Sequence, residues 1–324
     1  MVHKDSNPNH DFYWREEVPL IISSYRSIEV MTPHVAMLRD AGIIVRFKSN
    51  VRDRSGGEFY VEDSVVSSPH ERVELPGKNY VVTDTLPLLW RDSSLTRPRR
   101  VEILASGGIV IGSFTVHPFG PEMRVSKKVG LYSVIYDSPL KIALSRLGIE
   151  ETDLDMTHSS SEDLSSYSAI IMDQFSYKTF AESATRLENL RRWIDSGGRL
   201  LILPQFGMEM QGLHPGEETE FSYLPITPPS TEVFVDSTER FLNYPNRLTK
   251  DDFSTGAFPI SFGRIRGYKA GESKVLVSSQ GGVPLVVEET AGHGEIVFCA
   301  LNLYPRFLAV DETAYMLLAN LISN

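Results

Sequence analysis

Residues 129–148 read VGLYSVIYDSPLKIALSRLG, and this stretch decides the fold of the second half of the chain. A compact apolar run, Val129–Tyr136, is followed by Ser138–Gly148, where apolar residues recur at helical spacing and a glycine ends the pattern. Continuous apolar runs are typical of strands that are buried on both faces of a parallel sheet. The stretch therefore predicts one strand–helix unit of an open α/β sheet.

The same unit recurs downstream. Ser168–Phe175 predicts a second buried strand, Glu182–Gly198 predicts an amphipathic helix, and Arg199–Phe206 predicts a third strand. Because crossovers between parallel strands are right-handed, these elements predict a doubly wound domain.

The end of the chain carries a different pattern. Apolar segments separated by QGG and AGHG predict an antiparallel β-meander over 274–279, 283–290 and 294–301. Asp311 is expected to cap a last helix that extends to Ser323. Between the third strand and the meander, residues from about 208 to 274 are rich in Pro, Gly and Thr and predict a long insertion.

The first 125 residues repeat this pattern in outline. Val18–Tyr25 predicts a strand, Ser27–Gly42 a helix, Tyr80–Asp84 a strand, and Arg100–Phe114 a helix and strand joined at Gly107-Gly108. The spacing from Asp84 to Gly107 is one residue shorter than that from Asp173 to Gly197. Either the chain is a tandem duplication, or the match reflects the order of elements that any two α/β units share. We predict an α/β protein of two tandem doubly wound domains, residues 1–125 and 126–324, with the meander added to the second.

The composition narrows the class of protein. The 324 residues are 41% hydrophobic and 23% charged, which is a globular composition, and the formal net charge of −10 argues against a nucleic-acid partner. A single cysteine excludes an intramolecular disulfide. No signal peptide or apolar run long enough to span a membrane is visible, so a cytoplasmic protein without a membrane partner is expected.

A family resemblance rests on the Gly197-Gly198 turn, on VPLVVEETAGHGEIVFCALNL (283–303) and on LLANLIS (317–323). These segments resemble the class I glutamine amidotransferase-like superfamily, and more specifically its β-galactosidase trimerisation and trehalose-utilisation-like branch. HDFYWREE (10–17), YVVTD (80–84) and ILASGGIVIGS (103–113) are similar to the same branch. The resemblance implies flavodoxin-like, amidotransferase-like domains and a link to carbohydrate metabolism.

The glutaminases of that superfamily place a nucleophilic cysteine on a turn after the strand that follows Gly-Gly, with a histidine near the last strand. The corresponding turns here, Leu203–Gly207 and Ile111–Phe114, hold no cysteine, and Asn302–Arg306 holds no histidine. Since this chemistry needs an activated nucleophile beside a base, the glutaminase triad is missing. Cys299 lies within an apolar strand and is predicted to be a core residue.

Polar side chains at the predicted carboxyl ends of the strands are the candidate ligand site, because ligands of open α/β sheets bind there. The candidates are Asp137, Asp173, Gln205, Asn302 and Tyr304, with Asp84, Ser113 and His117 as weaker ones. Hydrogen-bonding groups and a tyrosine ring suit a small polar ligand such as a sugar. No motif predicts a metal or a cofactor, since GGxxxG at Gly107 has neither Rossmann nor P-loop spacing.

The leading hypothesis is a non-catalytic binding or assembly module. The alternatives are a carbohydrate-active hydrolase or lyase that uses the carboxylates at the strand ends or a site between the domains, and a subunit that only forms a homo-oligomer. A bound sugar or paired carboxylates in a cleft would favour the enzyme, whereas a large exposed apolar patch would favour assembly.

Overall fold

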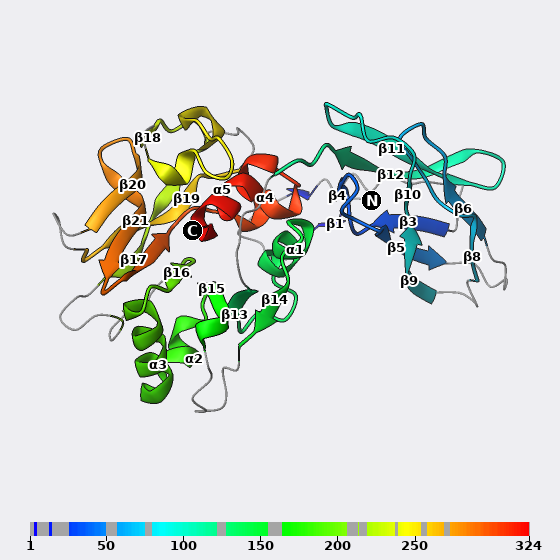
Figure 1. Ribbon diagram of the computed structural model, residues 1–324. Coiled ribbons are helices and arrows are strands. Elements are labelled where there is room, and N and C mark those ends of the chain that lie inside the picture. Colours follow the sequence, from blue (N-terminus) through cyan, green and yellow to red (C-terminus); the bar gives the residue numbers. More distant parts are fainter. Residues whose placement is uncertain are drawn as a thin grey trace. The chain divides into compact units, whose positions relative to one another are not determined.

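The computed structural model describes residues 3–4, 13–14, 26–49, 57–74, 80–121, 128–154, 164–205, 213, 219–236, 239–253, 258–268 and 273–323. The chain divides into two compact units (Figure 1). Unit 1 comprises residues 1–33, 41–94 and 100–115, and unit 2 comprises residues 34–40, 95–99 and 116–324. The predicted boundary between domains 1–125 and 126–324 falls at residues 122–127, outside the described residues, so that division stays a prediction.

The described part of unit 1 is built from strands alone, and most of them pair antiparallel. These strands are β1 (His3–Lys4), β2 (Tyr13–Trp14), β3 (Arg26–Val30), β5 (Gly42–Ser49), β6 (Gly57–Val61), β7 (Val66–Ser67), β8 (Glu71–Val73), β9 (Tyr80–Pro87), β10 (Leu89–Trp90), β11 (Arg99–Ala105) and β12 (Ile109–His117). β3, β5 and β9 form one antiparallel sheet, and β12, β11, β6 and β8 lie next to one another in another.

The helix predicted over Ser27–Gly42 is wrong. These residues form β3, a break at Pro33, the short strand β4 (His34–Ala36) and the start of β5. Pro33 lacks the N–H that a helix interior needs. Of the other expected elements of this half, the strand Val18–Tyr25 lies outside the described residues.

The helix predicted before Gly107 is also wrong. Along β11, Val101 and Ile103 are buried and Glu102 is exposed, which is the two-residue period of a half-buried strand. Gly107 and Gly108, with φ of +85° and +76°, form the turn between β11 and β12. Unit 1 therefore does not repeat the α/β pattern of the second half in its described residues.

Unit 2 contains the predicted open sheet. Its parallel strands are β13 (Lys128–Tyr132), β14 (Glu151–Asp153), β15 (Tyr167–Met172), β16 (Arg199–Ile202) and β22 (Gly294–Cys299). Their order across the sheet is β14-β13-β15-β16-β22. In chain order this is 2-1-3-4-5, the arrangement of flavodoxin-like sheets.

Helices cover both faces of this sheet, as the continuous apolar runs predicted. On one face, residues such as Leu131, Ile171 and Val297 pack with α1 (Pro139–Arg146), α4 (Tyr304–Leu308) and α5 (Glu312–Ile322). On the other face, alternate residues pack with α2 (Tyr177–Ala181) and α3 (Ala184–Asp195). Figure 1 shows α2 and α3 on the opposite side of β13, β15 and β16 from α1, α4 and α5.

The meander is confirmed and extends the same sheet. β21 (Val283–Ala291) pairs antiparallel with β22 and with β20 (Ser273–Ser279). The described part of the insertion adds β18 (Val233–Val235) at the sheet edge, a separate antiparallel pair formed by β17 (Glu220–Thr227) and β19 (Ser261–Arg266), and the 3₁₀ turns Arg240–Leu242 and Lys250–Phe253. A third 3₁₀ turn, Leu164–Ser166, precedes β15.

Side-chain caps mark the starts of α1, α3 and α5. Ser138 accepts a hydrogen bond from Leu140 N at the start of α1, and Asp311 accepts one from Thr313 N at the start of α5, as predicted. Among the described residues, no helix has the length and apolar character that crossing a membrane requires.

Candidate functional site

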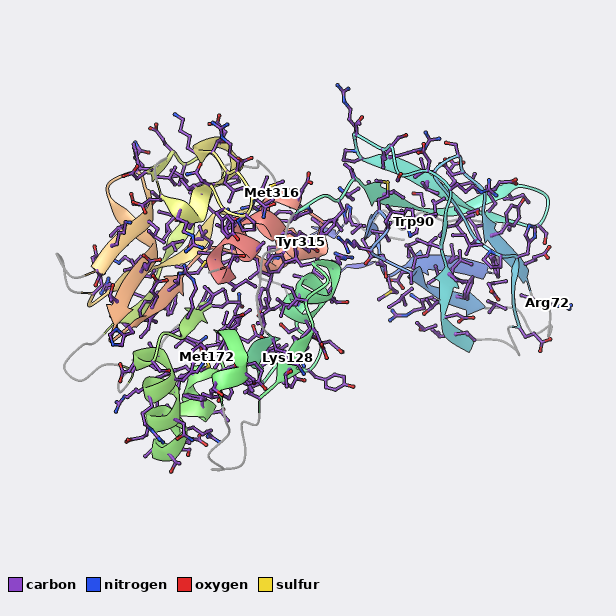
Figure 2. All side chains as sticks on the ribbon, in the orientation of Figure 1. Arg72, Trp90, Lys128, Met172, Tyr315 and Met316 are labelled. Carbon is purple, nitrogen blue, oxygen red and sulfur yellow. The ribbon has the colours of Figure 1, made fainter. Side chains whose placement is uncertain are left out.

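The candidate site centres on Asp173, which directly follows the carboxyl end of β15; Figure 2 labels Met172, the last residue of that strand. The Asp173 side chain is fully buried. Its Oδ2 accepts a hydrogen bond from Ser133 Oγ at 2.6 Å. Its Oδ1 accepts bonds from Gln174 N at 2.7 Å and from the Tyr304 hydroxyl. Both carboxyl oxygens are therefore occupied by donors of the protein itself.

Three segments of the chain supply this cluster. Ser133 follows β13, and Tyr304 is the first residue of α4. Ser138 Oγ lies 3.3 Å from the Tyr304 hydroxyl while it caps α1. We call Ser133, Ser138, Asp173 and Tyr304 the Asp173 cluster. It joins the ends of two neighbouring parallel strands to the starts of two helices.

Burial raises the pKa of Asp173, against the opposing effect of hydrogen bonds from Ser133 and Ser138. The Ser133 hydroxyl also lies 3.1 Å from Ile135 O and has a single proton to donate. When Asp173 is ionised, it accepts a hydrogen bond from the Ser133 hydroxyl. When Asp173 is protonated, it donates a hydrogen bond to Ser133 instead, and the Ser133 hydroxyl donates its own hydrogen bond to Ile135 O. The cluster thus accommodates either protonation state of the carboxyl.

Gln205 is also fully buried and bonds only to the backbone. Its Nε2 donates to Asp173 O at 2.6 Å and to Leu203 O at 2.8 Å, and its Oε1 accepts from Tyr177 N at 3.0 Å. The side chain therefore ties the ends of β15 and β16 to the start of α2. Both N–H donors of this buried amide are therefore engaged by the protein backbone.

The remaining predicted residues differ in exposure. Asp137 is exposed and makes no hydrogen bond to any other described residue. Asn302 is 9% exposed, and its Nδ2 lies 3.3 Å from Pro259 O, to which it donates. Tyr136, 88% exposed, and Phe175, 44% exposed with φ of +59°, lie in the turns that follow β13 and β15. We call Tyr136, Asp137, Phe175 and Tyr304 the strand-end surface.

The structure brings Asp173 and Tyr304 into direct contact and links Gln205 to them through the Asp173 backbone. Sequence reasoning missed Ser133 and Ser138. The available signal was that Ser133 interrupts an apolar run at a strand end and that Ser138 precedes a proline at a helix start.

Two of the weaker candidates, Asp84 and Ser113, do not lie at the ends of parallel strands. Asp84 is an exposed residue within the antiparallel strand β9, and its Oδ1 accepts a bond from Thr85 N at 2.8 Å. Ser113 lies within β12, where its Oγ accepts a bond from Arg100 Nε at 3.0 Å. Both positions were derived from the predicted repeat, which the strands of unit 1 do not follow.

The third weaker candidate, His117, is the last residue of β12. Its Nε2 lies 3.0 Å from Nδ1 of His34, which belongs to the same unit. Burial, followed by the neighbouring His34 and Arg146, lowers the pKa of His117 to about 4. His117 is therefore a neutral imidazole at neutral pH.

Cys299 is fully buried in β22, as predicted, and burial raises the pKa of its thiol to about 12. A thiol with that pKa is not a thiolate nucleophile at neutral pH. Among the described residues, no group of three or more His, Cys, Asp or Glu side chains is placed to hold a metal ion.

Comparisons with known proteins give structural likenesses of limited extent. No protein-family model matches the chain, and no curated protein matches its sequence. Similar solved structures include the exo-β-1,4-mannosidase Op5Man5 from Opitutaceae bacterium strain TAV5, with 14% identity, a TM-score of 0.38, and coverage of 59% of this chain and 35% of that one.

A β-galactosidase from Rahnella sp. R3 has 14% identity and a TM-score of 0.36, covering 59% of this chain and 31% of that one. A β-galactosidase from Bacillus circulans sp. alkalophilus has 15% identity and a TM-score of 0.40, covering 62% and 31%. The chain thus spans about a third of the length of these enzymes. None of the three is titled an amidotransferase.

Proposed function

We propose that unit 2 is a non-catalytic module that binds a small polar ligand, such as a sugar, at the strand-end surface. The observation that carries this proposal is the Asp173 cluster, which fixes the Tyr304 hydroxyl and the turn after β13 from three separate segments. A buried carboxyl whose two oxygens both accept hydrogen bonds from the protein is suited to holding the neighbouring groups in place. Asp173 and Gln205 are therefore positioning residues.

The groups available to a ligand are those that reach the surface. Asp137 offers carboxylate oxygens that make no hydrogen bond to other described residues, and the exposed Tyr136 and Phe175 rings and the half-buried Tyr304 ring offer apolar faces on which a sugar ring stacks. Parallel strands that end at one edge of an open sheet are the usual place for such a site. The 2-1-3-4-5 strand order also supports a distant relation of unit 2 to amidotransferase-like domains, which we retain as a proposal.

The test is a calorimetric titration of the full chain with glucose, galactose, mannose and trehalose. We expect saturable binding of at least one sugar. Asp137→Asn should weaken that binding roughly tenfold, because a hydrogen bond to a charged acceptor contributes on the order of 1.5–3 kcal/mol. Tyr304→Phe, which keeps the ring but removes the bond to Asp173, should weaken it as well. Asp251→Asn, an exposed carboxylate on a 3₁₀ turn, is the matched control.

Unchanged affinity in both Asp137→Asn and Tyr304→Phe would reject the strand-end surface as the site. Release of nitrophenol from nitrophenyl glycosides, lost in Asp137→Asn but retained in Asp251→Asn, would replace the binding module with the hydrolase alternative.

A further inference from the structure

A second candidate site lies at the opposite, amino-terminal ends of the parallel strands of unit 2. A cavity of about 120 Å³ is lined by Arg199, the first residue of β16, and by Glu295, the second residue of β22. An adjoining cavity of about 260 Å³ shares Arg199, Arg240 and Glu295 in its lining. This site and the strand-end surface share no residue, and neither proposal depends on the other.

The wall of the smaller cavity contains an ion-pair network that leaves acceptors unused. Buried Arg199 donates Nη1 to Glu295 Oε2 and Nη2 to Glu288 Oε2, the latter at 3.3 Å, and its Nε donates to Leu321 O at 2.7 Å. The other carboxylate oxygen of each glutamate accepts no hydrogen bond from the described residues. Across the whole lining, Arg199, Arg240 and Lys274 face Glu239, Glu288 and Glu295, so the formal charges balance.

An unpartnered hydroxyl in the same wall points independently to a ligand. Ser323 is 4% exposed and lines the cavity, and its Oγ has no hydrogen-bond partner among the described residues. A buried hydroxyl without a partner costs on the order of 1–3 kcal/mol, so a ligand that bonds to it recovers that cost. The free oxygens of Glu288 and Glu295 and the Ser323 hydroxyl make three acceptors, which matches the three donors of a primary ammonium.

A cation lines both cavities. Arg240 pairs with no carboxylate of the described residues; its guanidinium lies 5.0 Å from the centroid of the Tyr244 ring. A guanidinium fork is suited to bidentate binding of a carboxylate. The lysine of the lining, Lys274, is already paired with Glu239. The lining therefore offers acceptors for an ammonium and a free donor for a carboxylate.

We propose that this cavity binds a small α-amino acid, with its ammonium on Glu288, Glu295 and Ser323 and its carboxylate on Arg240. The volume of about 120 Å³ is that of roughly four water molecules, which suits glycine or alanine. Burial raises the pKa of Glu288, and a bound ammonium offsets that effect by stabilising the ionised carboxylate.

The experiment is calorimetry on the full chain at pH 7 with L-alanine as the probe, and with ethylamine and propionate as probes that lack one charged group each. We expect saturable binding of alanine, with ethylamine and propionate each at least tenfold weaker. Ser323→Ala should weaken alanine binding roughly tenfold without loss of folding, because its hydroxyl bonds to nothing in the described protein. Ser145→Ala, which removes an exposed hydroxyl of α1, is the matched control and should bind alanine normally.

Arg240→Gln provides a second, independent variant. It should weaken alanine binding and abolish the preference for alanine over ethylamine, because the carboxylate then has no guanidinium to bind. The proposal is overturned if alanine shows no saturable binding, if ethylamine or propionate binds as tightly as alanine, or if Ser323→Ala and wild type have equal affinity for alanine.

Discussion

At the scale of single residues, the Asp173 cluster and the His34–His117 pair show how burial controls protonation. Burial raises the pKa of the Asp173 carboxyl and lowers that of the His117 imidazole, since in both cases the charged form loses water. Asp173 compensates with donors on both oxygens. His117 has one imidazole neighbour, His34, and the cation Arg146 nearby, with Asp311 as the opposing negative charge.

The lowered pKa of His117 predicts that the folded protein loses stability in acid. Between pH 6.5, the ordinary value, and about pH 4, the unfolded chain binds a proton that folded His117 does not. The free energy of unfolding should therefore be fully retained above pH 6.5 and fall as the pH is lowered towards 4. Urea denaturation of wild type and His117→Gln at pH 7, 6 and 5 checks this, and the variant should lose less stability on acidification. If the free energy of unfolding fell equally with pH in wild type and His117→Gln, the expectation would be contradicted.

The candidate site was predictable in part. Asp173 and Tyr304 followed from strand ends and meet directly in the structure. Ser133 and Ser138 were not predicted, because serine is common in turns at strand ends and helix starts, and the sequence does not show which residue its hydroxyl contacts. Gln205 was predicted as a residue that binds the ligand, and a sequence does not show that its amide bonds to backbone groups of the neighbouring segments.

At the scale of elements, prediction succeeded where the apolar pattern had one interpretation. The predicted strand Val129–Tyr136 and the predicted helix Ser138–Gly148 differ clearly in period, and they form β13 at Lys128–Tyr132 and α1 at Pro139–Arg146. In Ser27–Gly42 the apolar residues fit both the helical and the strand period over short windows. Pro33 disfavours a helix there, and the residues around it form strands. The match of spacings between the halves was a coincidence of turn glycines, because Gly107 closes a hairpin and Gly197 ends a helix.

The contact between α3, β16 and β22 depends on a residue without a side chain. A Cβ added to Gly294 would lie 2.2 Å from Ile194 O and 2.3 Å from Gly198 O, both of them backbone atoms. Gly294→Ala should therefore lower the free energy of unfolding by about 3 kcal/mol, through overpacking. Gly281→Ala is the control: its Cβ would meet no atom within 4 Å, and only the φ of +85° is unfavourable, at about 1 kcal/mol. Equal losses in urea denaturation would show that the close approach is not what requires glycine.

At the scale of the whole molecule, unit 2 is assembled from separate parts of the chain. Residues 34–40 belong to it although they precede most of unit 1 in sequence. Asp40 Oδ1 and Oδ2 accept bonds from Arg146 Nε and Nη2 at 2.9 and 2.8 Å. Arg146 also donates Nη1 to Tyr315 OH at 2.7 Å and to Phe307 O. This buried network holds a segment of the first half on α1, α4 and α5.

Loss of Asp40 should be costly for this reason. The Arg146 side chain is only 6% exposed, and Asp40→Ala leaves its charge without a carboxylate. We expect a loss of about 3–5 kcal/mol in the free energy of unfolding. Asp153→Ala removes the partner of Lys141 in a pair whose aspartate is 64% exposed, and should cost no more than about 1 kcal/mol. If Asp40→Ala lowered the free energy of unfolding as little as Asp153→Ala does, residues 34–40 would not anchor unit 2.

The Asp40–Arg146–Tyr315 network also has a consequence for synthesis on the ribosome. Its two links span 106 and 169 residues of sequence. At roughly 5–20 residues per second, about ten to thirty seconds pass between the emergence of Arg146 and that of Tyr315. During that interval the arginine that α1 will bury has no phenol to bind. Completion of this core therefore waits until Tyr315 has been synthesised, well after Asp40 and Arg146.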